Sequence, residues 1–386
     1  GSEYAKQNIA TSLATAVFLY SFSGSARKGL NIRELRVTIL KEGFPKTIVG
    51  DAVQKLEEEL WYFHASSGNY SFKNQANLNR VIVDTENQVK DAEINDELRS
   101  ILQKNMGRAI ETILWPKSTS DIPDSRKIKL AVLGTNMTHP GTAADKFTEE
   151  IYTKAGAGFR VYKNGLMLLA MDENSTNILS KHVRRLLALE LVQKDEGQRK
   201  NIAKNDLLEL SKKSNASKSQ IPYLLHSAYR YLGHLTDDGV RWIDLGMPTI
   251  GAFSSLSDRV KEHMCDEELM LTQISPQVIL KHTKLGGEEE KNINDIFEMY
   301  LKTPGLPLLQ SKETLLGGIR IGVQNSLFGL KMETGVVFGK AVFDIEGEMN
   351  IIGKSLAEKS TDSTEEELEE EEKEDDNGKK DEKKDD

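Results

Sequence analysis

Residues 3–80 carry the pattern that most constrains how this chain folds: three stretches with apolar residues at helical spacing, followed by two aromatic runs. In the third stretch the apolar residues share one helical face, which consists of Val49, Ala52, Val53, Leu56 and Leu60. The aromatic runs at 61–64 and 70–72 flank the turn residues 66–69, and this pattern predicts a β-hairpin. Three helices followed by a two-stranded wing is the order of a winged helix, which we predict for residues 3–80.

The two earlier stretches fit the same interpretation. In residues 5–22 the face expected to be buried consists of Ile9, Leu13, Ala16, Val17 and Tyr20. Asn31 is a good N-cap for a second helix, because its side-chain oxygen can accept hydrogen bonds from the free N–H groups of the first turn. Gly43 and Pro45 then separate this helix from the third.

A change of period at Lys127 indicates a small α/β unit over residues 126–198, after a helical connector over 81–125. Buried strands are expected at 128–133 and 166–171. Each is followed by an apolar helical stretch, at 142–154 and 175–191 respectively. This order favours parallel pairing of the two strands. The Asn164-Gly165 dipeptide leaves an alternative open, because it is a strong hairpin signal and would pair a strand at 159–163 with the second buried strand.

The rest of the chain divides into three parts by its pattern. Residues 199–265 form a predicted helical segment, whose first part, 199–235, ends in a tyrosine-rich stretch. Residues 266–356 form a second, winged-helix-like module, with a strand expected at 336–343. We therefore predict an α+β chain that is mostly helical.

Residues 357–386 are predicted to form a disordered acidic tail. From Glu358 onward the tail holds sixteen acidic and six basic residues, so it carries a net charge of −10 while the rest of the chain carries +1. Leu368 is its one apolar side chain from that point, and too little surface can be buried to offset the entropy of ordering.

The chain contains no complete nucleotide-binding or zinc-binding motif. Gly347 and Gly353, which precede Lys354, are separated by five residues, whereas a phosphate-binding loop has four. His263 and Cys265 have no second pair of ligands at zinc spacing. We therefore predict no cofactor and no metal within this chain.

Carboxylates offer the remaining route to catalysis. Only Asp145, Asp172 and Glu173 are candidates for a nuclease or phosphoesterase in the α/β unit. The Asp172-Glu173 pair is sufficiently explained as the acidic start of a helix. We therefore predict that the chain is not an enzyme.

The cysteine content and the hydropathy indicate where in the cell the chain is located. Cys265 is the single cysteine, so an internal disulfide is excluded and a reducing cytoplasm is the predicted location. No stretch approaches 18 consecutive apolar residues, so no membrane span is expected.

The third helix of a winged helix commonly contacts DNA, and its charge tests that role. Residues 45–60 carry a net charge of −2, although phosphate contacts require positive charge. The candidate DNA-binding residues are Arg33, Arg36, Lys46, Thr47, Lys55 and Lys73. We favour a winged helix that packs against, or binds, a protein partner, with direct DNA contact as the alternative.

The order of several distinctive segments resembles a family of large prokaryotic AAA+-type ATPases that carry the domain of unknown function 499. The matching segments are ATAVFLYSFSG at 14–24, LEEELWYFH at 56–64, YSFKNQANLN at 70–79, NGLMLLAMD at 164–172, LPLL at 306–309 and GIRIGVQNSLFG at 318–329. The resemblance would cover about residues 4 to 356, and none of these segments is a catalytic motif.

The resemblance implies a place in a larger protein. Members of that family are often encoded beside DNA methyltransferases in defence or modification islands. Their nucleotide-binding domain would lie N-terminal to the region matched here, so ATP and magnesium are expected there and not in this chain. We therefore expect a non-catalytic C-terminal scaffold that engages the ATPase domain or another protein partner, with a stand-alone winged-helix DNA-binding regulator as the alternative.

Overall fold

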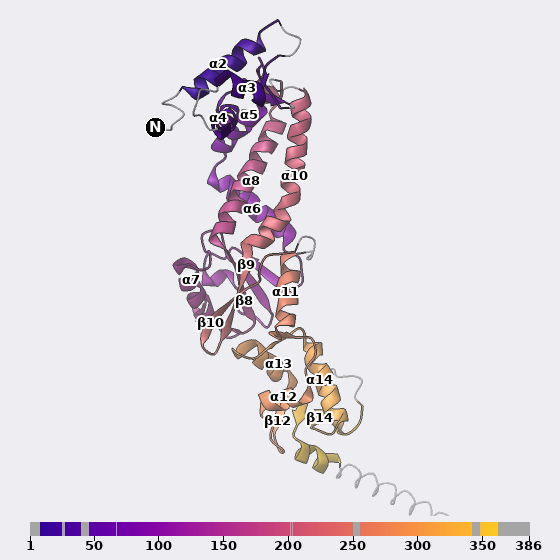
Figure 1. Ribbon diagram of the computed structural model, residues 1–386. Coiled ribbons are helices and arrows are strands. Elements are labelled where there is room, and N and C mark those ends of the chain that lie inside the picture. Colours follow the sequence, from indigo (N-terminus) through magenta and orange to yellow (C-terminus); the bar gives the residue numbers. More distant parts are fainter. Residues whose placement is uncertain are drawn as a thin grey trace, which may run out of the picture. The chain divides into compact units, whose positions relative to one another are not determined.

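The computed structural model describes residues 8–24, 28–39, 46–66, 68–200, 202, 204–249, 255–341 and 348–361. Among these residues about 53% are helical and 18% lie in strands, so the fold is α+β and mainly helical, as the sequence predicted (Figure 1). None of the described helices combines the length and apolarity that crossing a bilayer requires.

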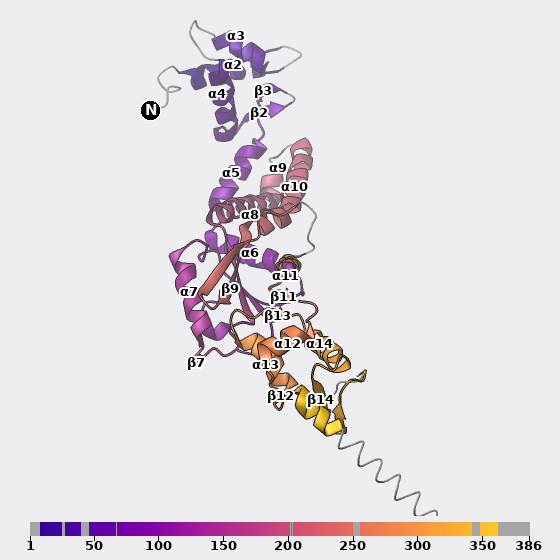
Figure 2. The ribbon, with the colours of Figure 1, turned by 60° about the horizontal axis from the view of Figure 1, so that its bottom comes forward.

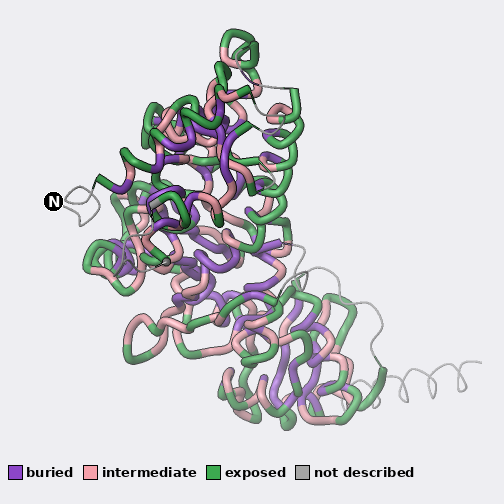
Figure 3. Tube along the Cα trace, turned by 45° about the horizontal axis from the view of Figure 1, so that its top comes forward, coloured by how far each residue is buried: buried purple, intermediate pink, exposed green. Residues whose placement is uncertain are grey.

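The chain folds into two compact units, and each is built from two separate stretches. The first unit comprises Gly1–Lys104 and Asn174–Ala228, and the second comprises Asn105–Glu173 and Tyr229–Asp386. The boundaries expected from the linear pattern at 126 and 199 do not coincide with this division. Figure 3 shows buried residues in the interior of the chain's folded parts and exposed residues outside.

The first unit begins with a module that we call the N-terminal module. It consists of α2 (Ile9–Ser21), β1 (Leu30–Asn31), α3 (Ile32–Ile39), α4 (Lys46–Glu59), β2 (Phe63–Ser66) and β3 (Asn69–Phe72). The strands form an antiparallel sheet in the order β1-β3-β2, and the predicted hairpin is confirmed as β2–β3. Leu13, Leu35, Val53 and Phe63 are among the residues of its core.

The start of α3 shows how local sequence sets a boundary. Asn31 Oδ1 accepts hydrogen bonds from the N–H groups of Arg33 and Glu34, at 2.9 and 3.0 Å. Glu34 Oε2 in turn accepts from the Asn31 N–H at 2.9 Å. This reciprocal pair is a capping box, so the predicted N-cap is confirmed.

The described part of the first unit contains five further helices. They are α5 (Leu78–Gln88), α6 (Asp91–Asn105), α8 (Glu173–Lys194), α9 (Glu196–Lys200) and α10 (Lys204–Ala228). Helices α8 and α10 lie side by side (Figures 1 and 2), and Lys218 on α10 forms an ion pair of 2.7 Å with Glu190 on α8. Arg184 and Arg185 of α8 pair with acidic groups of α6 and α5, which are Asp91 at 2.6 Å and Glu86 at 3.3 Å.

The second unit is organised around a five-stranded sheet in the order β10-β9-β8-β5-β4. Its elements are β4 (Glu111–Leu114), the 3₁₀ helix η1 (Thr119–Asp121), β5 (Lys129–Val132), α7 (Thr142–Thr153), β6 (Lys154–Ala155), β7 (Gly158–Phe159), β8 (Leu166–Met171), β9 (Tyr229–Thr236) and β10 (Gly239–Asp244). Strands β4, β5 and β8 are parallel, which confirms the parallel pairing predicted for the two buried strands.

Two predictions for this region were wrong. The connector over 81–125, expected to be helical, contains strand β4. The helical segment expected over 199–265 contains strands β9 and β10. In both cases pairing with distant strands outweighs the local helical pattern. In β9, Gly233 pairs with Trp242 of β10, and a Cβ at Gly233 would lie 2.8 Å from the indole ring. The indole therefore covers a glycine that would weaken an unsupported strand.

The Asn164-Gly165 hairpin alternative was also wrong. Strand β7 pairs with β6, and β8 pairs with β5 and β9 instead. The buried Asn164 side chain donates hydrogen bonds to the carbonyl oxygens of Tyr300 at 2.7 Å and Leu306 at 2.9 Å. Its role is to satisfy distant backbone groups within the second unit.

The remainder of the second unit contains several short helices and strands. These are α11 (Leu256–Asp266), β11 (Met270–Leu271), α12 (Pro276–Thr283), β12 (Glu290–Asn292), α13 (Ile293–Lys302), β13 (Leu308–Leu309), α14 (Lys312–Gln324), β14 (Gly329–Met332), β15 (Gly335–Val337) and β16 (Asn350–Ile352). We call the part from α12 onward the C-terminal module; it contains a sheet in the order β12-β16-β14-β15. The strand expected at 336–343 is shorter, since β15 ends at Val337, and residues 342–347 lie outside the described part.

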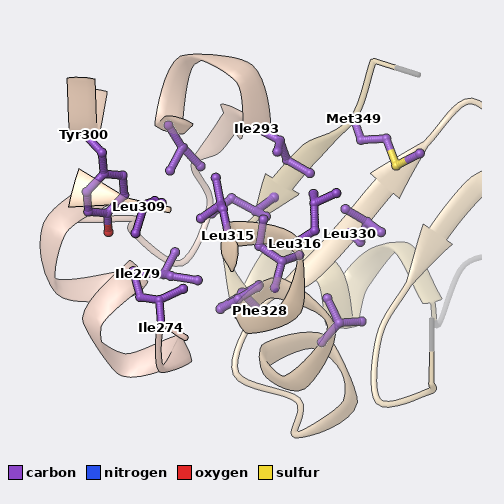
Figure 4. Packing of buried hydrophobic residues seen from close by; sticks show 14 residues of the cluster. Ile274, Ile279, Ile293, Tyr300, Leu309, Leu315, Leu316, Phe328, Leu330 and Met349 are labelled. Carbon is purple, nitrogen blue, oxygen red and sulfur yellow. The ribbon is translucent and has the colours of Figure 1, made fainter. Parts of the chain in front are cut away.

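Apolar side chains from several elements of the C-terminal module converge on one core (Figure 4). Phe328, directly before β14, and Leu330, within β14, lie with Leu315 of α14 and Ile279 of α12, and all four are fully buried. A Cβ at Gly322 of α14 would lie 2.2 Å from the Phe328 ring, so the ring occupies the space that a side chain would need.

The predicted disorder of the tail was wrong for its first residues. Residues 354–361 are helical, and Ala357 is fully buried. Ala357 packs where Gly329 has no side chain, since a Cβ at Gly329 would lie 2.6 Å from that of Ala357. Residues 362–386 lie outside the described part of the chain.

Glu298 of α13 links the C-terminal module to the loops beside the sheet. Its side chain is 7% exposed and lies 2.5 Å from both Lys302 Nζ and Arg126 Nε, and its Oε2 accepts a hydrogen bond from the Tyr162 hydroxyl at 3.2 Å. The hydrogen bond from Lys302 is the main reason that the pKa of Glu298 lies below its usual value of 4.5.

A pH dependence follows from this carboxylate. Because its folded pKa is lowered, its contribution to stability is present above pH 4.5 and is lost as the pH falls through the folded value. Glu298→Gln is therefore expected to lower the melting temperature at pH 7 and to reduce the loss of stability below pH 4.5. Scanning calorimetry across this range measures both effects, and an unchanged acid profile in the variant would contradict the assignment.

Candidate functional site

The predicted DNA-binding residues lie on three elements of the N-terminal module. Arg33 and Arg36 are on α3, and Thr47 and Lys55 are on α4, which begins at Lys46. Lys73 follows β3 directly and is exposed. The side chain of Lys46 lies outside the described part of the chain.

The exposed face of α4 is acidic. Asp51, Glu58 and Glu59 are exposed, as are Thr47 and Lys55. Lys55 Nζ lies 3.8 Å from Glu59 Oε1, so this lysine is partly neutralised by its own helix. Carboxylates at this position would repel the phosphates of a DNA backbone.

The C-terminal half of α2 presents an apolar surface that the sequence reasoning missed. We call it the α2 face; it consists of Phe18, Leu19 and Phe22, whose exposed fractions are 52%, 63% and 64%. Tyr20 is also exposed, at 51%, but it lies about 200° around the helix from Phe18 and is not part of this face. Phe18 packs against Phe22 with ring centroids 5.0 Å apart and against Phe72 at 5.7 Å. The inward placement expected for Tyr20 was therefore wrong.

A signal for the α2 face was present in the sequence. Residues 16–22 read AVFLYSF and are apolar almost all round the helix, whereas a surface helix normally buries one stripe. Ala16 and Val17 are buried in the module's core, so the other apolar residues must face outward. Contiguous exposed apolar side chains of this kind mark interaction surfaces.

The Gly-Lys-Ser sequence lies in the C-terminal module, and the backbone donors of Gly353 and of Leu356, which follows the sequence, are engaged with carbonyl oxygens. The Gly353 N–H donates to the Glu289 carbonyl at 2.9 Å, and the Leu356 N–H donates to the Gly287 carbonyl at the same distance. Lys354 Nζ lies 3.8 Å from Glu358 on its own helix. These N–H groups therefore point at carbonyl oxygens and not at an anion.

The structure places the candidate carboxylates on different elements. Asp145 is on α7, Asp172 follows β8, and Glu173 begins α8. Within the described ranges, no three His, Cys, Asp or Glu side chains converge to hold a metal ion. His263 and Cys265 both lie on α11.

An aromatic cluster lies beside the strand ends of the sheet. Trp115 follows β4 with a positive φ of 54°, and its Nε1 donates to the Tyr229 hydroxyl at 2.8 Å. The Tyr229 hydroxyl donates in turn to the Leu133 carbonyl at 3.0 Å, and burial raises the Tyr229 pKa. Left-handed backbone at a non-glycine residue persists only where surrounding contacts hold it, and these two hydrogen bonds supply such contacts.

His139 forms a second set of aromatic contacts, with one residue of β9 and one of β10. Its ring stacks on Trp242 at 4.4 Å and meets the edge of Tyr231 at 5.1 Å. Burial holds the pKa of His139 below its usual value of 6.5, so the imidazole is neutral at pH 7. Asp145 Oδ1 lies 3.7 Å from His139 Nδ1, which is beyond hydrogen-bonding distance.

No protein-family model, no curated protein and no solved structure matches this chain.

Proposed function

We propose that this chain is a non-catalytic C-terminal scaffold of a large AAA+-type ATPase in prokaryotic defence or DNA modification. In this proposal the N-terminal module is a winged helix that binds a protein through the α2 face. The partner is the nucleotide-binding domain that the family resemblance places N-terminal to this region.

The order of elements supports two winged helices. In the N-terminal module the order helix, short strand, two helices and hairpin is that of α2, β1, α3, α4, β2 and β3. The first strand pairs with the last, as in a winged helix. The C-terminal module has a similar order in α12, β12, α13, α14 and β14, with the additional short strand β13 between α13 and α14, and β12 again pairs with the last strand, β16.

The exposure of the α2 face is the single observation that carries the proposal. Phe and Leu side chains buried at an interface contribute about 1.5–3 kcal/mol each, and aromatic side chains are enriched where proteins bind one another. On the same module the exposed face of α4 is acidic. The chemistry of the surface therefore favours a protein over DNA as the partner.

Substitutions in the α2 face test this proposal. Phe18→Gln and Phe22→Gln are each expected to weaken binding of the nucleotide-binding domain encoded upstream by about tenfold or more, which corresponds to about 1.4 kcal/mol. Leu208→Gln on α10 is the matched control, because Leu208 is 66% exposed on another element. Isothermal titration calorimetry provides the affinities.

Three outcomes would contradict the proposal: the absence of such an upstream domain, the absence of binding, or equal losses in the Leu208 control. The scaffold should also show no nucleotide turnover, and millimolar ATP should leave its melting temperature unchanged.

A stand-alone DNA-binding regulator is the second candidate, and one observation favours it. Lys28, Arg33 and Lys73 are exposed, and none has an ion pair within the described ranges. Asn69 of the hairpin donates to the Lys28 carbonyl at 2.6 Å, which holds Lys28 beside the turn. Duplex binding that weakens steeply with salt, with a shallower slope in Arg33→Gln and Lys73→Gln, would favour this candidate over the scaffold.

A further inference from the structure

A groove of about 480 Å³ lies in the second unit between α7 and the β9–β10 hairpin. Its apolar side consists of Leu235, Val240 and Trp242, which also pack on the core beneath the sheet. The α7 side contributes Asp145, Thr148, Glu149, Tyr152 and Thr153, and Lys163 and Gly239 complete the lining. The groove thus combines an apolar surface with a small number of polar groups, as ligand sites do.

Thr148 is the polar group that requires explanation. The residue is 2% exposed, and its Oγ1 forms no hydrogen bond with any described residue. Thr153, one and a half turns later, shows the usual solution, because its Oγ1 donates to the Glu149 carbonyl at 2.8 Å. A buried hydroxyl without a partner is rare in folded proteins, and a ligand in the groove would provide one.

The two carboxylates of the groove define the charge of that ligand. Asp145 and Glu149 are exposed and lie four residues apart on α7, a spacing at which like charges repel across the helix surface. Neither carboxylate lies within 4 Å of a lysine or arginine nitrogen in the described residues. The nearby imidazole of His139 is neutral at pH 7 and does not balance Asp145.

We propose that this groove binds an organic cation that has a primary ammonium group on an apolar chain. The ammonium lies between Asp145 and Glu149 and donates a hydrogen bond to Thr148 Oγ1, while the chain packs on Val240 and Trp242. A free alkylamine and a lysine side chain of a protein partner share this chemistry. The inference does not depend on the role proposed for the α2 face.

Titration of the full chain with n-hexylammonium, followed by NMR or calorimetry, tests the site. We expect saturable binding at millimolar concentration, and binding at least about tenfold weaker for n-hexanol and hexanoate, which lack the positive charge. Nα-acetyl-lysine methylamide separates the two sources: tighter binding than hexylammonium indicates a lysine side chain, and weaker binding indicates a free amine.

Three variants locate the binding. Glu149→Gln is expected to weaken hexylammonium binding about tenfold, whereas Glu150→Gln, on the next residue of α7 and outside the groove lining, should leave it unchanged. Thr148→Val keeps the shape of the side chain and removes a hydroxyl that has no partner. It should weaken binding several-fold without lowering the melting temperature.

Other results of the same titrations would contradict the proposed ammonium site. Absence of saturable binding, equal binding of hexanol and hexylammonium, or equal affinities in Glu149→Gln and Glu150→Gln would overturn the proposal. Tighter binding of hexanoate than of hexylammonium would assign the site to Lys163 and would also overturn it.

Discussion

Replacing Phe328 with alanine is expected to lower the free energy of unfolding of the C-terminal module by about 3–5 kcal/mol. Phe328 is fully buried, and its ring lies against Gly322 on α14, where no other side chain can take its place. Removal leaves a cavity between α14 and the sheet, and the glycine cannot fill it. This loss approaches the total free energy of unfolding of a small domain, which is about 5 kcal/mol at the low end.

The measurement must report on this module specifically. The tryptophans lie at positions 61, 115 and 242, so none belongs to the C-terminal module. Hydrogen exchange at the amides of β14 and β16, which pair with one another, reports on it directly. Ile321→Ala is the matched control on α14, because Ile321 is 50% exposed and should cost about 0.5 kcal/mol or less. Equal acceleration of exchange in the two variants would contradict the packing of Phe328 against α14.

Replacing Arg160 with methionine is expected to destabilise the second unit by about 3 kcal/mol. The Arg160 side chain is 1% exposed, and it donates to the carbonyls of Ile151 at 2.5 Å, Ile122 at 3.0 Å and Lys154 at 3.3 Å. Burial lowers the pKa of the guanidinium, and Asp124, at 3.9 Å, favours its charged form. Methionine fills similar space but leaves these acceptors without a donor.

Urea denaturation followed by tryptophan fluorescence measures this effect, because Trp115 and Trp242 lie in or beside the sheet of the second unit. Lys154→Met provides the control: it removes an exposed cation from a nearby position and preserves the carbonyl that Arg160 uses. A midpoint in Arg160→Met no lower than in Lys154→Met would show that the guanidinium is dispensable.

The sequence was most informative where structure is local. The spacing of Val49, Ala52, Val53 and Leu56 identified α4, and all four residues are buried. Asn31 identified the start of α3, because the residues that form a helix cap lie within one turn of each other. The β2–β3 hairpin followed for the same reason, since a tight turn and its flanking strands are read from neighbouring residues.

The sequence failed where the partner of a segment lies far along the chain. Strand β9 has a helix directly before it, and its strand conformation depends on pairing with β8 and β10. The candidate sites show the same division. The basic residues could be named from the sequence, whereas the exposure of Phe22 and the unpartnered hydroxyl of Thr148 emerged only after folding.

The sequence by itself thus determined local features such as helix α4, the cap of α3 and the β2–β3 hairpin, and it showed that no complete nucleotide-binding motif is present. Only the tertiary structure decided which apolar residues remain uncovered, which strands join the central sheet and where a groove forms beside α7. The physical reason is that periodicity identifies the apolar side of an element. Burial depends on whether another segment, often one far along the chain, covers that side.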